Sequence, residues 1–176
     1  MRAILGTFRL IGLAAVLVFL QPTVSAVEYV PEWRPPFDKR HPWKIVQEFH
    51  APSHPRDRGH RGIDLVAPLG TPIYSVGHGV VHFSGVIAGK PTLSINHGMH
   101  PKLAAQPIRS TYEPVSTHLK IGEAVSAGQF IGYTSTGNSH CSNKCLHLGI
   151  KIGKDSYKNP QLLWSRSSSL IPSARG

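Results

Sequence analysis

The sequence is poor in acidic residues, in cysteines and in stretches that could form long helices. It contains 9 Asp and Glu residues against 19 Lys and Arg, which gives a formal net charge of +10. Such a charge suits a polyanionic partner, either nucleic acid or a cell surface. The chain has no aromatic-basic RNA-binding pattern, no paired-Cys finger and no basic helix, so we expect no nucleic-acid partner.

Gly and Pro are frequent, with 17 and 15 residues. Between them lie short runs rich in Val, Ile, Thr, Tyr and Phe, which predict a β-rich domain with many turns. Residues 51–59 are expected to form a loop, and residues 97–107 a long surface hairpin loop. The predicted strands cover residues 44–49, 71–75, 79–86, 91–96, 108–113, 129–134 and 146–152.

The N-terminus has the pattern of a secretory signal peptide. Arg2 and Arg9 precede an apolar run from Ile11 to Leu20, and small residues follow, ending at Ala26. We expect cleavage after Ala26 and a secreted or cell-wall-associated protein, with no membrane contact beyond residues 1–26. The alternative is an uncleaved anchor, although the apolar run is short for a membrane span. Cleavage would remove two arginines and leave 10 − 2 = +8 on the mature chain.

The rest of the chain divides by composition. Residues 27–43 are rich in Pro and aromatic residues and predict an extended arm whose Trp side chains are buried against the domain. Residues 44–164 form that domain. Residues 165–176 are expected to be a flexible tail.

Residues His60-Arg61-Gly62-Ile63-Asp64 carry the first chemical signal. Positions i and i+4 of a strand share one face, so the imidazole of His60 and the carboxylate of Asp64 could reach one point. Both groups are good zinc ligands. Gly62 has no side chain to obstruct their approach. A second signal lies far downstream, in Cys145-Leu146-His147.

Several segments occur in a familiar order: HRGIDL, APLGTPIYSVGHGVVHFSG, LSINHG, RSTYEPV, IGEAVSAGQFIGYTSTGN and CLHLGI. Over about residues 44–164 the chain resembles the lysostaphin-type zinc endopeptidases of bacterial cell walls. The resemblance implies an all-β fold, an antiparallel sheet of the duplicated-hybrid-motif or barrel-sandwich type with little helix. It implies Zn²⁺ as cofactor, His60, Asp64 and His147 as its ligands, and peptidoglycan peptides as substrate.

The chain departs from that family at two places where the family keeps an imidazole. Pro114 occupies one of them and Cys145 the other. His118 is the nearest sequence candidate to replace a lost proton acceptor, and His140 the next. Cys145 could act as acid or base, bind zinc as a fourth ligand, or form a disulfide with Cys141. In an exported protein we favour the disulfide between Cys141 and Cys145.

Three hypotheses follow. The first is an active zinc endopeptidase that cuts peptide cross-links of peptidoglycan. The second is a non-catalytic zinc-binding member of the same fold that binds wall peptides or regulates a hydrolase. In either case the basic surface could also attract anionic wall polymers. The third is a biotin- or lipoyl-carrier domain, which we discount because no Lys occupies a suitable hairpin tip and carriers need no HxxxD motif.

Overall fold

The computed structural model describes residues 33–38, 43–54, 57–100, 104–137 and 144–164. The predicted signal peptide at residues 1–26, the tail at 165–176, and both His140 and Cys141 lie outside these ranges. Most of the arm from residue 27 to residue 43 lies outside them as well. Within the described ranges, no helix is long and apolar enough to cross a membrane.

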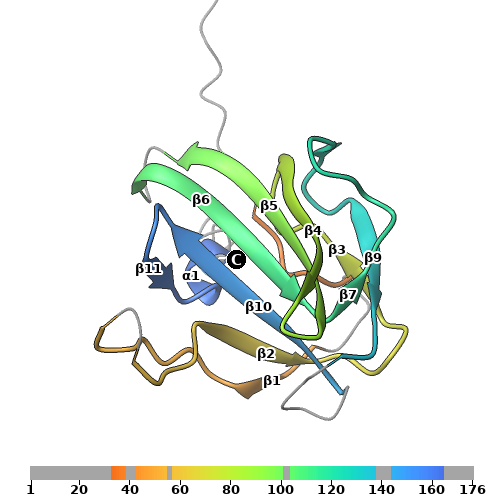
Figure 1. Cartoon of the computed structure of the whole chain (residues 1–176), viewed down its shortest axis with the longest axis horizontal. Coiled ribbons are helices and arrows are strands. Elements are labelled where there is room, and N and C mark those ends of the chain that lie inside the picture. Colours follow the sequence, from red (N-terminus) through yellow and green to blue (C-terminus); the bar gives the residue numbers. More distant parts are fainter. Residues whose placement is uncertain (1–32, 39–42, 55–56, 101–103, 138–143, 165–176) are drawn as a thin grey trace, which may run out of the picture.

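The larger of two antiparallel sheets dominates the fold (Figure 1). Its eight strands follow the order β1-β2-β10-β6-β5-β4-β8, and β11 pairs with β10. Their bounds are β1 Ile45–Gln47, β2 Gly62–Val66, β4 Gly79–Ile87, β5 Lys90–His100, β6 Ala104–Glu113, β8 Ala124–Val125, β10 Cys145–Ile152 and β11 Ser156–Lys158.

The smaller sheet has the order β3-β9-β7. Its strands are β3 Pro72–Tyr74, β7 Val115–Ser116 and β9 Phe130–Thr134, and the one described helix is α1 Gln161–Trp164. The prediction of an all-β, antiparallel fold with little helix is confirmed.

The predicted surface loop over residues 97–107 is wrong. β5 continues to His100, β6 begins at Ala104, and Met99 pairs with Pro107 across the two strands. The register shifts between Asn96 and Met99, and Gly98 has a positive φ of 70°. An irregularity of this kind inserts residues without ending a strand, so Gly and Pro indicate a bulged ladder here rather than a loop.

Strand alternation separates a core face from an open face on the large sheet. On β2 and β10, every second residue is fully buried and points into one core that also receives residues of the small sheet. Each such aliphatic side chain stabilises the fold by roughly 1.5–3 kcal/mol. The intervening residues face the other way and are available for a site. The buried residues of these two strands are Ile63, Leu65, Leu146, Leu148 and Ile150.

Of the two Trp residues in the N-terminal arm, one is buried as predicted and the other is exposed. Trp33 and Phe37 are buried in the core cluster. The backbone N–H of Tyr74 donates to the carbonyl oxygen of Pro36 over 2.9 Å, which holds the arm against β3. Trp43 is 37% exposed, so its predicted burial is wrong. It lies just before the edge strand β1, where its ring meets Trp164 edge-on at 6.2 Å.

Candidate metal centre

The open face of β2 and β10 brings the predicted ligands together. Asp64 lies on β2, and His60 lies four residues earlier, where it forms a β-bridge with His50. In the antiparallel pairing of β10 with β2, His147 stands directly opposite Asp64. Opposed residues of neighbouring strands project to the same face, so all three side chains point to one place.

The ligand atoms form a tight triangle. His60 Nε2 is 3.1 Å from Asp64 Oδ1 and 3.1 Å from His147 Nδ1, while His147 Nδ1 is 2.9 Å from Asp64 Oδ1. Among the described residues, this is the group of His, Cys, Asp and Glu side chains that could hold a metal ion. The structure thus places His60, Asp64 and His147 as the sequence predicts.

The triangle fits a zinc ion. Tetrahedral zinc with bonds of about 2.0–2.2 Å separates neighbouring ligand atoms by about 3.3–3.5 Å, close to the spacing found here. The Asp64 side chain is fully buried, while His60 and His147 are 10% and 20% exposed. A buried carboxylate is costly in the absence of a compensating cation or hydrogen bonds, and a metal ion would supply that compensation.

A backbone carbonyl fixes the orientation of His60. The Nδ1 atom of His60 is 2.8 Å from the carbonyl oxygen of Glu48. A carbonyl oxygen only accepts, so Nδ1 carries the proton and Nε2 presents its lone pair to the triangle. Donation from the second ring nitrogen to a carbonyl is the usual support of a metal-binding histidine.

Gly62 is required by close packing. A Cβ atom at this position would lie 2.2 Å from the Leu148 carbonyl oxygen and 2.7 Å from His147 Nε2. Neither contact is tolerable for a carbon atom. The expectation that Gly62 leaves room for the ligands is therefore confirmed, and the group it accommodates is the ring of His147.

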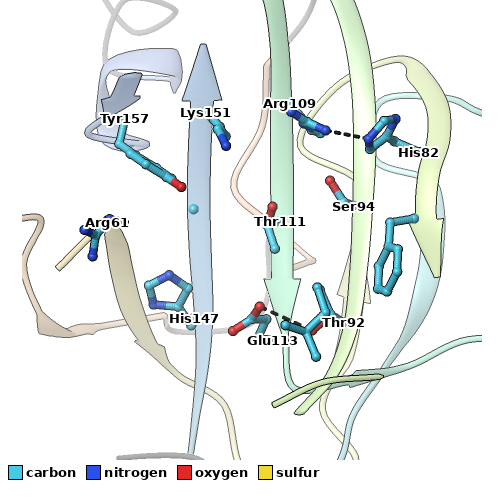
Figure 2. Close-up of a pocket in the computed structure, with 13 residues that line it drawn as sticks. Arg61, His82, Thr92, Ser94, Arg109, Thr111, Glu113, His147, Lys151 and Tyr157 are labelled. Atoms are coloured by element: carbon cyan, nitrogen blue, oxygen red, sulfur yellow. Dashed lines mark hydrogen bonds between the residues drawn. The ribbon is translucent and has the colours of Figure 1, made fainter. Parts of the chain in front are cut away.

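Two pockets adjoin the triangle and share Arg61 and His147 in their walls. The first, called here the main pocket, has a volume of about 410 Å³. Figure 2 shows its lining, which comes mainly from β4, β5, β6 and β10. The second pocket, of about 420 Å³, adds His60 and Lys90. The metal centre is thus accessible from an open groove on the sheet.

Glu113 is a site residue that the sequence analysis missed. It stands opposite His147 in the pairing of β6 with β10 and is the one acidic residue among the described residues that line the main pocket. Its Oε2 is 2.8 Å from Lys90 Nζ, and its Oε1 accepts from the Thr92 hydroxyl over 3.2 Å. The signal available was its place beside Pro114, where the family resemblance implies a missing imidazole.

The other predicted site residues lie elsewhere. His118 is exposed, follows β7 of the small sheet and lines neither pocket that holds His147. Pro114 is buried between β6 and β7. Cys145 is buried at the start of β10, outside the ligand triangle. Its pairing with Cys141 stays a prediction, because Cys141 lies outside the described residues.

Comparison with known proteins places this geometry in a family. The model of peptidase family M23 matches residues 58–160, which contain all three ligands of the triangle. The chain belongs to peptidase family M23. This family comprises zinc-dependent peptidases that act on peptidoglycan. The resemblance seen in the sequence is thereby confirmed, whereas the replacement of two family imidazoles stays a prediction.

The chain is also similar to curated proteins of mycobacteria. Uncharacterized proteins of Mycobacterium tuberculosis and Mycobacterium bovis are each 36% identical over 121 residues, which cover 68% of this chain and 46% of theirs. The chain therefore spans less than half the length of these relatives.

Solved structures share the fold at low sequence identity. A chain of the SpoIIIAH–SpoIIQ complex matches with a TM-score of 0.60 and 16% identity, covering 74% of this chain and 98% of that one. A point mutant of the catalytic domain of the prophage-encoded M23 protein EnpA from Enterococcus faecalis matches with a TM-score of 0.55 and 23% identity. The match covers 73% of this chain and 95% of that one. Lysostaphin from Staphylococcus simulans matches with a TM-score of 0.56 and 19% identity, covering 77% of this chain and 56% of that one.

Proposed function

We propose that the protein is a secreted zinc metallopeptidase that cuts peptide cross-links of bacterial peptidoglycan. The observation that carries the proposal is the triangle of His60, Asp64 and His147 beside an open pocket, in a member of family M23. The signal-peptide pattern of residues 1–26 supports export, which would also allow the disulfide between Cys141 and Cys145.

His60, Asp64 and His147 would hold the zinc ion. Three protein ligands are the usual set of a catalytic zinc site, because the fourth position is left for water or substrate. A zinc ion so bound supplies Lewis-acid polarisation of the peptide carbonyl and a water of lowered pKa.

Glu113 would accept and return the proton. Its carboxylate lies on the strand next to His147 and lines the same pocket. Lys90 and Thr92 hold its two oxygens, which fixes its direction. The sequence candidate His118 stays a prediction, but its exposed position after β7, outside both pockets beside His147, favours Glu113 by geometry.

The second hypothesis, a non-catalytic zinc protein that binds the wall or regulates a hydrolase, rests on Pro114 and Cys145. Neither the buried Pro114 ring nor the buried Cys145, which lies outside the triangle, supplies the imidazole expected from the resemblance. Basic residues exceed acidic ones by ten, and such a charge would hold either kind of protein near an anionic wall.

The experiment is a zymogram on purified peptidoglycan beside a zinc assay. The proposal expects about one zinc per chain and clearing of the wall substrate, lost in Asp64→Ala. Zinc and wall binding with no detectable cleavage would establish the non-catalytic hypothesis instead. Absence of bound zinc after reconstitution would overturn both.

A further inference from the structure

The main pocket has a cationic end that the proposed chemistry does not use. Arg109 on β6 and Lys151 on β10 both line it. Figure 2 shows them at the end remote from His147 and Glu113. We propose that Arg109 and Lys151 form a subsite for a free carboxylate of the substrate peptide. This inference rests on the proposed function and names the kind of wall peptide that the site selects.

The two cations lie directly across from each other on neighbouring strands, which lowers the stability of the sheet. Lys151 pairs directly with Arg109 in the register of β10 and β6. Like charges placed directly across two strands destabilise a sheet, and this pair is half-buried, where water screens the repulsion less well. A bound anion would relieve that repulsion.

Among the residues that the structure describes, no carboxylate neutralises this pair. Within the described part of the chain, neither Arg109 nor Lys151 forms an ion pair with Asp or Glu. Arg109 contacts the imidazole of His82, and Lys151 Nζ lies 5.5 Å from the ring centroid of Tyr157. Glu113, the pocket's carboxylate, is held by Lys90. The contacts that position the two cations are therefore with the rings of His82 and Tyr157.

The register fixes the distance between the subsite and the metal centre. His147 and Lys151 are four residues apart on one face of β10, which corresponds to roughly 13 Å. Glu113 and Arg109 run beside them on β6. An extended peptide covers roughly 3.3–3.6 Å per residue, so the carboxylate would belong to a residue about two to four positions from the scissile bond.

The surface of the sheet between the metal centre and the two cations leaves room for such a peptide. Gly149 lies between His147 and Lys151 and faces Thr111 of β6. A Cβ at Gly149 would have Arg61 O at 3.4 Å as its nearest neighbour, so the position is not closed by packing. The absence of a side chain keeps the route from the metal centre to the cations open.

One pocket runs from the metal centre to the two cations. We therefore infer that the ligand is a peptide carboxylate rather than an anionic wall polymer. The cations share one pocket with His147 and Glu113, so a molecule that reaches both ends would be the substrate itself. An arginine can bind a carboxylate through two parallel N–H donors, which gives direction as well as attraction.

The test uses zinc-loaded protein and cross-linked wall peptides in which each free carboxylate is converted in turn to a carboxamide. Binding is measured by calorimetry, and KM and kcat wherever cleavage occurs. Conversion of one particular carboxylate should weaken binding about 10-fold to 100-fold, the usual effect of a charge-assisted hydrogen bond. Arg109→Gln and Lys151→Gln should each weaken binding of the free acid and abolish its advantage over the amide.

Lys158→Gln is the matched control, because it removes the same charge from an exposed residue of β11 that does not line the main pocket. If Lys158→Gln weakens binding of the free acid as much as the pocket variants do, the attraction to anions is general and includes wall polymers. That result would overturn the subsite. So would equal binding of acid and amide. Calorimetry needs no turnover, so the subsite can be supported or rejected even if no cleavage is found and the proposed function fails.

Discussion

His147 stands directly opposite Asp64 on neighbouring antiparallel strands, and their ligand atoms are 2.9 Å apart. The two residues are 83 positions apart in the chain. Their meeting depends on the register of β10 against β2, and a shift by one residue would turn His147 into the core. The metal centre is therefore a property of the sheet as a whole.

Removal of any ligand of the triangle should abolish zinc binding. Three protein ligands are the minimum of a stable catalytic zinc site, so His60→Ala, Asp64→Ala and His147→Ala should each lower the metal content from about one per chain to near zero. Metal analysis after dialysis measures this. His54→Ala is the control, because His54 is exposed and, within the described ranges, its ring pairs with Asp57 and not with the triangle. Full zinc content in Asp64→Ala would disprove the assignment.

Gly62→Ala should destabilise the protein and disturb the metal centre. The new Cβ would lie 2.2 Å from a backbone oxygen of β10, so the strands must separate locally. We expect a loss on the order of 3 kcal/mol or more in the free energy of unfolding, measured by urea denaturation.

Gly149→Ala is the matched control for that substitution, because Gly149 pairs with Gly62 in the register and its added Cβ would meet nothing closer than 3.4 Å. It should cost less than about 1 kcal/mol. Similar losses in the two variants would mean that the close packing around Gly62 is not what holds the site.

The ligands were predictable from the sequence because strand alternation alone places residues 60 and 64 on one face. His147 followed from the resemblance of its segment. The order and register of strands could not be derived, since they depend on pairings between distant segments. For that reason Glu113, Arg109 and Lys151 went unnoticed: each gains its role only when β6 lies beside β10. Residues 97–107 were predicted as a loop, and the strand pairing of Met99 with Pro107 was missed, because bulges tolerate Gly98 within a paired strand.

Glu113→Gln should lower kcat by about 10²-fold to 10⁴-fold, the usual effect of losing a general acid or base. Zinc content should not change, because Glu113 is outside the triangle. Lys90→Gln removes the ion pair that directs Glu113 but keeps the carboxylate, so it should lower kcat less than Glu113→Gln does. Peptidoglycan cleavage is measured as the release of soluble peptides. If His118→Ala loses activity and Glu113→Gln keeps it, the sequence-based prediction of His118 is correct and the assignment of Glu113 is wrong.

Stability should fall in mild acid because of His97. Burial, partly offset by a hydrogen bond to the carbonyl oxygen of His78, lowers the pKa of His97 from 6.5 to about 4. Its Nδ1 donates to that oxygen over 2.7 Å, its Nε2 is 2.7 Å from the hydroxyl oxygen of Ser110, and its ring meets Trp33 edge-on. Nδ1 therefore carries the single proton of the neutral ring, and Nε2 accepts from the hydroxyl.

Between pH 6.5 and about 4 the unfolded chain binds a proton at His97 that the folded protein does not. The contribution of His97 to the free energy of unfolding is therefore fully present above pH 6.5 and is lost as the pH falls toward 4. From pH 7.5 to pH 5.0 we expect a loss of up to about 2 kcal/mol, at about 1.4 kcal/mol per pH unit below 6.5. Urea denaturation at the two pH values, under the same zinc concentration, measures the difference. His97→Gln cannot titrate, so its loss over this interval should be smaller by that amount, while the remaining histidines contribute equally to both proteins. An identical pH dependence in His97→Gln and the unaltered protein would show that His97 is protonated as readily in the fold as in the unfolded chain.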